Sequence, residues 1–71
     1  MSDHTSRNGI DGVTRRRVKA LLVEGEPNKV IARKVGIEPA TVKRHVEYIM
    51  RETGARNRTQ AAVRLALERL E

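Results

Sequence analysis

Residues 36–54 read GIEPATVKRHVEYIMRETG, and this stretch predicts one amphipathic helix with marked ends. Pro39 suits the first helical position because any N–H would be unpaired there, and Gly54 suits the left-handed residue that follows a helix. Helical spacing sorts the residues between them into two faces. The inward, largely apolar face comprises Val42, Val46, Ile49 and Thr53. The outward, polar and basic face comprises Ala40, Lys43, Arg44, Glu47 and Arg51.

A second, shorter helix is predicted just before this one. Pro27 fits its first turn, Gly36 ends it, and Ile31, Ala32 and Val35 supply a small inward face. A helix of about two turns is unstable alone in water, so it must pack against its neighbours. A short helix, a glycine turn and a longer helix with a basic outer face form the arrangement that helix-turn-helix proteins place in the major groove of DNA.

The first helix is predicted to begin with Thr14 as its N-cap and to end at Gly25. Val13 is then expected to pack on Val18 as a hydrophobic staple. Val18, Leu21 and Leu22 share the inward face. The remaining basic side chains should look outward into solvent, with one or two touching phosphate; they are Arg15, Arg16, Arg17 and Lys19.

The fourth helix is predicted from about Arg58 to Arg69, with Asn57 as N-cap and Gln60 three residues later, a variant of the capping box. It carries two apolar lines. One line consists of Ala62 and Leu65, and the other of Val63, Ala66, Leu67 and Leu70. One contact face needs only one such line, so we interpret the second as a dimer contact rather than extra core.

Composition limits the function classes. With 71 residues, 38% hydrophobic residues and a formal charge of +6, the chain fits one small helical domain with a marginal core and a polyanionic partner. It has no cysteine, and His4 and His45 are too far apart for a local metal motif. An apolar run of the ~20 residues that span a bilayer is missing, as is a signal-peptide core, so we expect a soluble, cytoplasmic protein without membrane contact.

Residues 1–12 are rich in turn-formers and poor in apolar side chains, so we expect a flexible tail, followed by one domain over residues 13–71. The alternative is a basic arm that follows the DNA backbone. Asp3 and Asp11 offset Arg7 and weaken that alternative. No sensor or receiver domain is visible, which leaves open a free-standing regulator and a piece of a longer one.

Three motifs follow one another at fixed distances: Asn28-Lys29 with Ile31-Ala32, then Thr41-Val42-Lys43 with His45, then Arg58-Thr59-Gln60-Ala61. Together they resemble the LuxR/GerE-type DNA-binding domain, over most of residues 13–70. The resemblance implies an all-α, four-helix domain whose third helix reads the major groove and whose fourth helix pairs with its copy in a dimer.

By position, the resemblance also implies residue roles. The side chains facing base edges would be Lys43, Arg44 and Glu47. Candidates for DNA backbone contacts are Asn28, Lys29, Thr41, His45 and Arg51. The dimer seam would include Thr59, Val63 and Ala66, which agrees with the apolar line that also contains Leu67 and Leu70.

The chain departs from the family pattern at several positions. Where the family usually has an Arg-Glu pair near the start of the first helix, this chain has Thr14-Arg15-Arg16-Arg17. Pro27 stands where the family usually has Ser or Thr, and Glu38 where it usually has Ser. Thr53 replaces a buried apolar side chain. Its hydroxyl should weaken the core unless it bonds back to a carbonyl.

We therefore expect a sequence-specific, double-stranded-DNA-binding transcription regulator that acts as a homodimer, leaving room for a contact with RNA polymerase. One alternative is a protein-interaction module that uses the fourth helix to bind polymerase, a sigma factor or a regulator; another is a module like region four of sigma factors. An enzyme is not expected. His45 has no acid partner at useful spacing, and the carboxylates lie on separate turns or faces. No cofactor, metal ion or small-molecule ligand is indicated.

Overall fold

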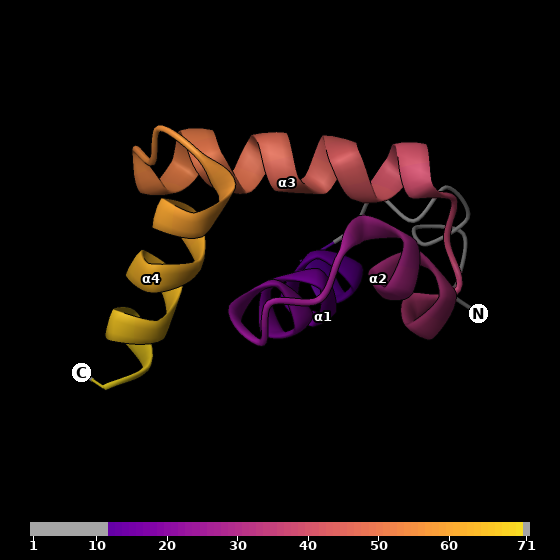
Figure 1. The fold of residues 1–71 in the computed structure, drawn as a ribbon, viewed down its shortest axis with the longest axis horizontal. Helices are drawn as coiled ribbons and strands as arrows, with labels where there is room; N and C mark the ends of the chain where they lie inside the picture. The colour runs from indigo at the N-terminus through magenta and orange to yellow at the C-terminus, as the bar shows by residue number, and fades with distance from the viewer. Residues whose placement is uncertain (1–11, 71) are drawn as a thin grey trace.

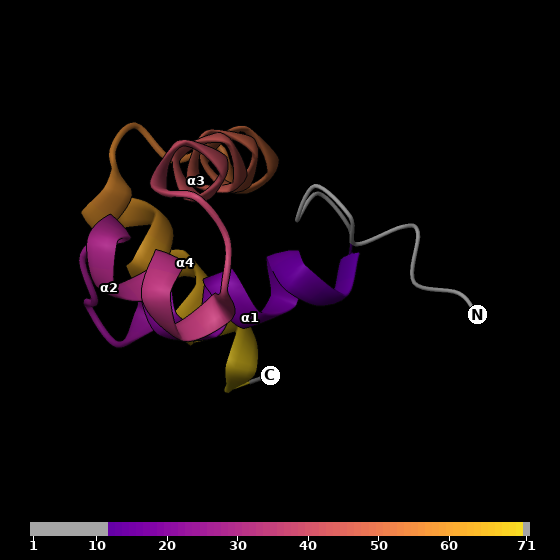
Figure 2. The same cartoon turned by 90° about the vertical axis from the view of Figure 1, so that its right-hand side faces the viewer.

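The computed structural model describes residues 12–70 as four helices. They are α1 (Gly12–Val23), α2 (Asn28–Val35), α3 (Pro39–Thr53) and α4 (Arg58–Arg69). In Figures 1 and 2, α3 lies along one side of the molecule, with α1 and α2 beneath it and α4 descending from its C-terminal end. The predicted all-α fold with a helix-turn-helix is confirmed. The predicted tail lies outside the described residues except for Gly12, which belongs to α1.

The ends of α3 and α4 lie at the predicted residues because local chemistry fixes them. Pro39 occupies the first turn of α3, and Gly54 follows its last turn with a φ of 72°. Before α4, the side chain of Asn57 accepts a hydrogen bond from the N–H of Gln60 at 2.8 Å. The Gln60 side chain accepts in return from the N–H of Arg56 at 2.7 Å, one residue earlier than a standard capping box would have it.

The predicted start of α1 is wrong. Thr14 is not an N-cap but the third residue of the helix, and its side chain is buried with 8% exposed. Val13 is 64% exposed, so it forms no staple on the fully buried Val18. Thr14, Val18 and Leu22 are spaced by four residues and all point inward. Packing of this face against the other helices therefore contributes to holding the first turns of α1 in place.

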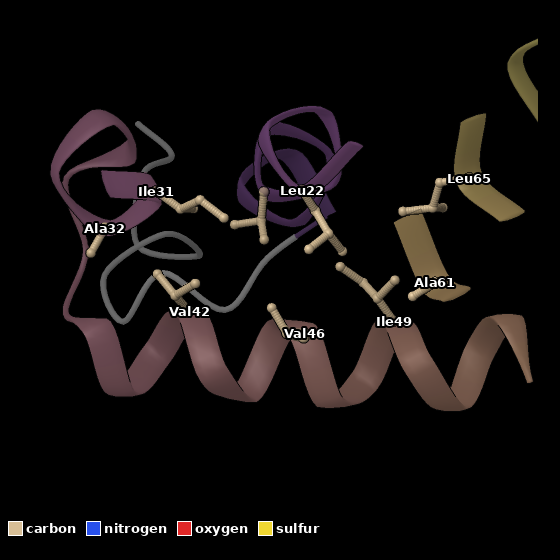
Figure 3. Packing of buried hydrophobic residues seen from close by; sticks show 9 residues of the cluster. Leu22, Ile31, Ala32, Val42, Val46, Ile49, Ala61 and Leu65 are labelled. Carbon is tan, nitrogen blue, oxygen red and sulfur yellow. The ribbon is translucent and has the colours of Figure 1, made fainter. Parts of the chain in front are cut away.

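All four helices contribute to one hydrophobic core (Figure 3). From α3, Val42, Val46 and Ile49 point toward the other three helices, as the spacing predicted. The side chains that meet them come from α1, α2 and α4: Val18, Leu22, Ile31, Ala32, Ala61 and Leu65. In α4 the most deeply buried residue is Ala61, whereas Ala62, which was expected to pair with Leu65, lies partly buried beside the core.

The hydroxyl of Thr53 bonds back to backbone carbonyls, so its burial costs little stability. The Oγ1 atom donates to the carbonyl of Ile49 at 2.8 Å, with a second contact to the carbonyl of Met50 at 3.3 Å. The hydroxyl is therefore not left unpaired in the half-buried end of α3.

Candidate nucleic-acid interface

The outer face of α3 is presented to solvent because the opposite face is fixed in the core. Val42 and Ile49 are fully buried and Val46 is 6% exposed, so α3 cannot roll without opening the core. The outward side chains predicted from the sequence are all exposed: Ala40, Lys43, Arg44, Glu47 and Arg51. The helix therefore presents three cations and one carboxylate along one side.

These charges are available to a partner. The ion pairs among residues 12–70 are Lys19 with Glu52 and Lys34 with Glu26, each at 3.2 Å. Neither involves the outer face of α3. Lys and Arg side chains that form no ion pair can donate to guanine or phosphate, and a Glu that forms no ion pair can accept from cytosine.

The turn between α2 and α3 sets the angle of α3. Gly36 ends α2 with a φ of 83°, and its N–H donates to the carbonyl of Ala32 at 2.8 Å. The next N–H, that of Ile37, donates to the same carbonyl at 3.1 Å, and the Ile37 side chain packs against the core. The two hydrogen bonds close the end of α2 around a left-handed glycine. Thr41, a predicted backbone contact, is half-buried in the first turn of α3.

The start of α2 is tied to the start of α4. The guanidinium of Arg58 donates through Nη1 to Oδ1 of Asn28 and through Nη2 to the carbonyl of Glu26, the latter at 2.5 Å. Since the oxygen of the Asn28 amide faces Arg58, its NH2 group remains a donor for another partner. The neighbouring Lys29 is exposed. Asn28 and Lys29 thus place donors beside the N-terminal end of the helix-turn-helix.

The position of His45 does not fit the expectation that its side chain contacts the DNA backbone. Its side chain is 1% exposed and lies among the largest buried side chains of the molecule. On α3, position 45 lies beside the buried residues Val42, Val46 and Ile49 rather than on the outer face. The neighbouring helices therefore cover its side chain. In this conformation the His45 side chain offers no surface to a phosphate.

The second apolar line of α4 stays uncovered in the single chain. Val63 is 53% exposed, Leu67 55% and Leu70 82%, while Thr59 is exposed and Ala66 half-buried. These five residues, which we call the α4 stripe, form one side of the helix. Two exposed large apolar side chains on α4, Val63 and Leu67, and a third on the residue that follows it, Leu70, make a surface suited to a protein contact.

A contact between Arg15 and Tyr48, which the sequence did not indicate, joins α1 to α3. The Cζ atom of Arg15 lies 3.9 Å from the centroid of the Tyr48 ring, so this arginine does not extend into solvent as expected. One turn further along both helices, Lys19 pairs with Glu52. Tyr48 is the sole aromatic residue of the types Phe, Trp and Tyr in the chain, which was the available signal.

Within residues 12–70 no cluster of three His, Cys, Asp or Glu side chains could hold a metal ion. None of the four described helices combines the length and the apolar composition that crossing a bilayer requires.

Comparison with known proteins identifies a family and two relatives to which the chain is similar. Residues 14–65 match the family described as "Bacterial regulatory proteins, luxR family". The chain is 34% identical over 68 residues to the nitrate/nitrite response regulator protein NarL of Escherichia coli K12, an alignment that covers 93% of this chain and 32% of NarL. It is 44% identical over 50 residues to the protein named "Putative HTH-type transcriptional regulator YhjB" of the same strain, an alignment that covers 70% of this chain and 25% of YhjB.

The chain thus spans about a third of NarL and a quarter of YhjB. No solved structure gave a significant match. The family match covers most of the described helices, including the whole of α2 and α3 and the turn between them. The chain belongs to the LuxR family of bacterial regulatory proteins.

Proposed function

We propose that this chain is a sequence-specific, double-stranded-DNA-binding module of a transcription regulator, with α3 inserted in the major groove. The observation that carries the proposal is the exposed outer face of α3, whose inner face is fixed in the core. The charged side chains on this outer face form no ion pair among residues 12–70; they are Lys43, Arg44, Glu47 and Arg51. Membership of a family of bacterial regulatory proteins supports the same class.

The side chains divide into two roles. Lys43 and Arg44 can donate to O6 and N7 of guanine, and Glu47 can accept from N4 of cytosine; each good contact is worth about 1–3 kcal/mol of discrimination. Asn28, Lys29, Thr41 and Arg51 border this face and suit the phosphate backbone. Backbone contacts fix register without reading sequence.

We further propose that the module binds as a homodimer through the α4 stripe. Burying the stripe against its copy would remove Val63, Leu67 and Leu70 from water, which favours association. Two copies would then present two α3 helices to two half-sites about one helical turn apart, and the operator would be an inverted repeat.

The test is selection of bound duplexes from a random pool, followed by a gel shift. Enrichment of an inverted repeat is the expected result. The exposed α4 stripe also suits a second function, a protein-interaction module for polymerase, a sigma factor or another regulator. Absence of duplex binding at low salt would overturn the DNA-binding proposal and favour this second function.

A further inference from the structure

We propose that Arg15 of α1 binds a DNA phosphate, that Tyr48 of α3 holds it in position, and that Arg15 and Arg51 together grip the same stretch of DNA backbone. This inference rests on the proposed function because it adds a contact beside the same face of α3. Helical spacing predicted only that one or two of the basic side chains of α1 touch phosphate, without choosing among them, and neither spacing nor the family resemblance assigns a role to Tyr48.

Tyr48 gathers two cations at the surface. The Arg15 Cζ lies 3.9 Å from the ring centroid and the Arg51 Cζ lies 6.0 Å from it, both within the range of a cation–π contact. At the shorter distance a planar guanidinium rests directly on the ring. Tyr48 itself is 39% exposed, so the group lies at the surface and is open to a ligand.

The charge of Arg15 has no anionic partner among residues 12–70. Its Nε atom is buried without a hydrogen-bond partner in this part of the chain. Its neighbours on α1 differ, because Lys19 pairs with Glu52 and Arg17 donates to the carbonyl of Lys34 at 3.3 Å. An aromatic ring neutralises no charge. Two guanidinium groups beside one ring repel each other, and a phosphate oxygen between them would offset that repulsion and accept their hydrogen bonds.

The register of α1 against α3 directs Arg15 toward the DNA side. Arg15 and Lys19 are four residues apart, as are Tyr48 and Glu52, so two contacts one turn apart align the helices. On α3, Tyr48 follows Arg44 by four residues and precedes Arg51 by three, so its ring borders the outer face. A helix lying in the major groove has backbone phosphates along its flanks, and Arg15 stands on one of these flanks.

Stacking makes the contact more favourable. A free arginine loses rotamer freedom when it binds an anion, whereas one already resting on Tyr48 has lost much of it beforehand. Arg15 is thus the phosphate ligand, and Tyr48 is a positioning residue that acts through it.

The experiment measures binding of the full 71-residue chain to a labelled duplex of scrambled sequence, by fluorescence anisotropy at several salt concentrations. Arg15→Gln removes the charge and keeps the stem over the ring. Loss of one phosphate contact lowers the salt slope by about 0.9, which corresponds to about an eightfold weaker affinity at 0.1 M salt. The control is Arg16→Gln, which removes the same charge from a residue that instead lines a pocket together with Leu65 and Glu68 of α4. It should leave the slope nearly unchanged.

Tyr48→Leu and Arg15→Lys keep the charge and remove the stacked geometry. Both variants should retain the salt slope and weaken duplex binding a few-fold. If circular dichroism shows that Arg15→Gln is poorly folded, these two variants still test the contact. In the Tyr48→Leu background, Arg15→Gln should cost less than in the unmodified protein, since the two residues act as a unit.

Two results would overturn the inference, and they are distinguishable. Duplex binding by the unmodified protein together with equal slopes for Arg15→Gln and Arg16→Gln would reject the Arg15 contact alone. Failure of the unmodified protein to bind any duplex at low salt would reject the proposed function and this contact with it.

Discussion

Arg58 of α4 donates a hydrogen bond to the side-chain oxygen of Asn28, thirty residues earlier at the start of α2. The same guanidinium donates to the carbonyl of Glu26, which lies just before the helix. One side chain therefore fixes the beginning of α4 to the beginning of the helix-turn-helix. It also turns the Asn28 amide so that the NH2 group points away from α4. The proposed dimer helix and a proposed DNA contact are thus held in one geometry.

Arg58→Ala should lower the free energy of unfolding by about 2 kcal/mol, because it removes two charge-assisted hydrogen bonds and leaves their part-buried acceptors without this donor. Urea denaturation measures the change. The matched control is Arg56→Ala, an exposed arginine two residues earlier, which should stay within about 0.5 kcal/mol. Equal stability of the two variants would contradict the role assigned to Arg58.

Gly54→Ala should destabilise the domain more than Gly36→Ala. Both glycines have a positive φ, at 72° and 83°, so each substitution carries the left-handed penalty of about 1–2 kcal/mol. A Cβ at position 54 would in addition lie 3.2 Å from Nη1 of Arg64, which donates to the carbonyl of Thr53 at 2.6 Å. At position 36 nothing lies within 4 Å. Thermal unfolding compares the two, and a smaller loss for Gly54→Ala would be inconsistent with this crowding.

Val63→Glu should prevent dimerisation by placing two like charges near the two-fold axis. Sedimentation velocity measures the association, and binding to a full inverted repeat should fall far more than binding to one half-site. Val13→Glu is the control, because it makes the same change at an exposed valine of α1. A monomeric state of the unmodified protein, both free and on DNA, would refute the dimer.

Features set by local chemistry could be predicted from the sequence. Pro39, Gly54 and Asn57 mark helix ends through their own backbone and side-chain preferences, and the structure places the boundaries of α3 and α4 there. The spacing of Val42, Val46 and Ile49 likewise predicted which side of α3 is buried.

Features that depend on contacts between helices could not be predicted in this way. Thr14 has the chemistry of an N-cap, but packing of α1 in the core makes it a buried helical residue. His45 lies where helical spacing leaves the choice between edge and core open, and neighbouring helices cover it. The contacts of Arg15 with Tyr48 and of Arg58 with Asn28 join residues about thirty positions apart, a relation that periodicity does not encode.

If α3 reads sequence, replacing Lys43 or Arg44 must affect DNA binding differently from replacing Arg51. Lys43→Ala and Arg44→Ala remove base contacts, so each should cost about 1–3 kcal/mol on the selected site and little on scrambled DNA. Arg51→Ala removes a backbone contact, so it should weaken both duplexes alike and lower the salt slope by about one unit.

Titration of these three variants on matched and scrambled duplexes at several salt concentrations is the most direct test of whether α3 reads sequence. The predicted result is a loss of discrimination for Lys43→Ala and Arg44→Ala, with discrimination kept in Arg51→Ala. If Lys43→Ala and Arg44→Ala instead weakened both duplexes equally, α3 would act only as a charged rod, and the sequence-reading role proposed for it would be contradicted.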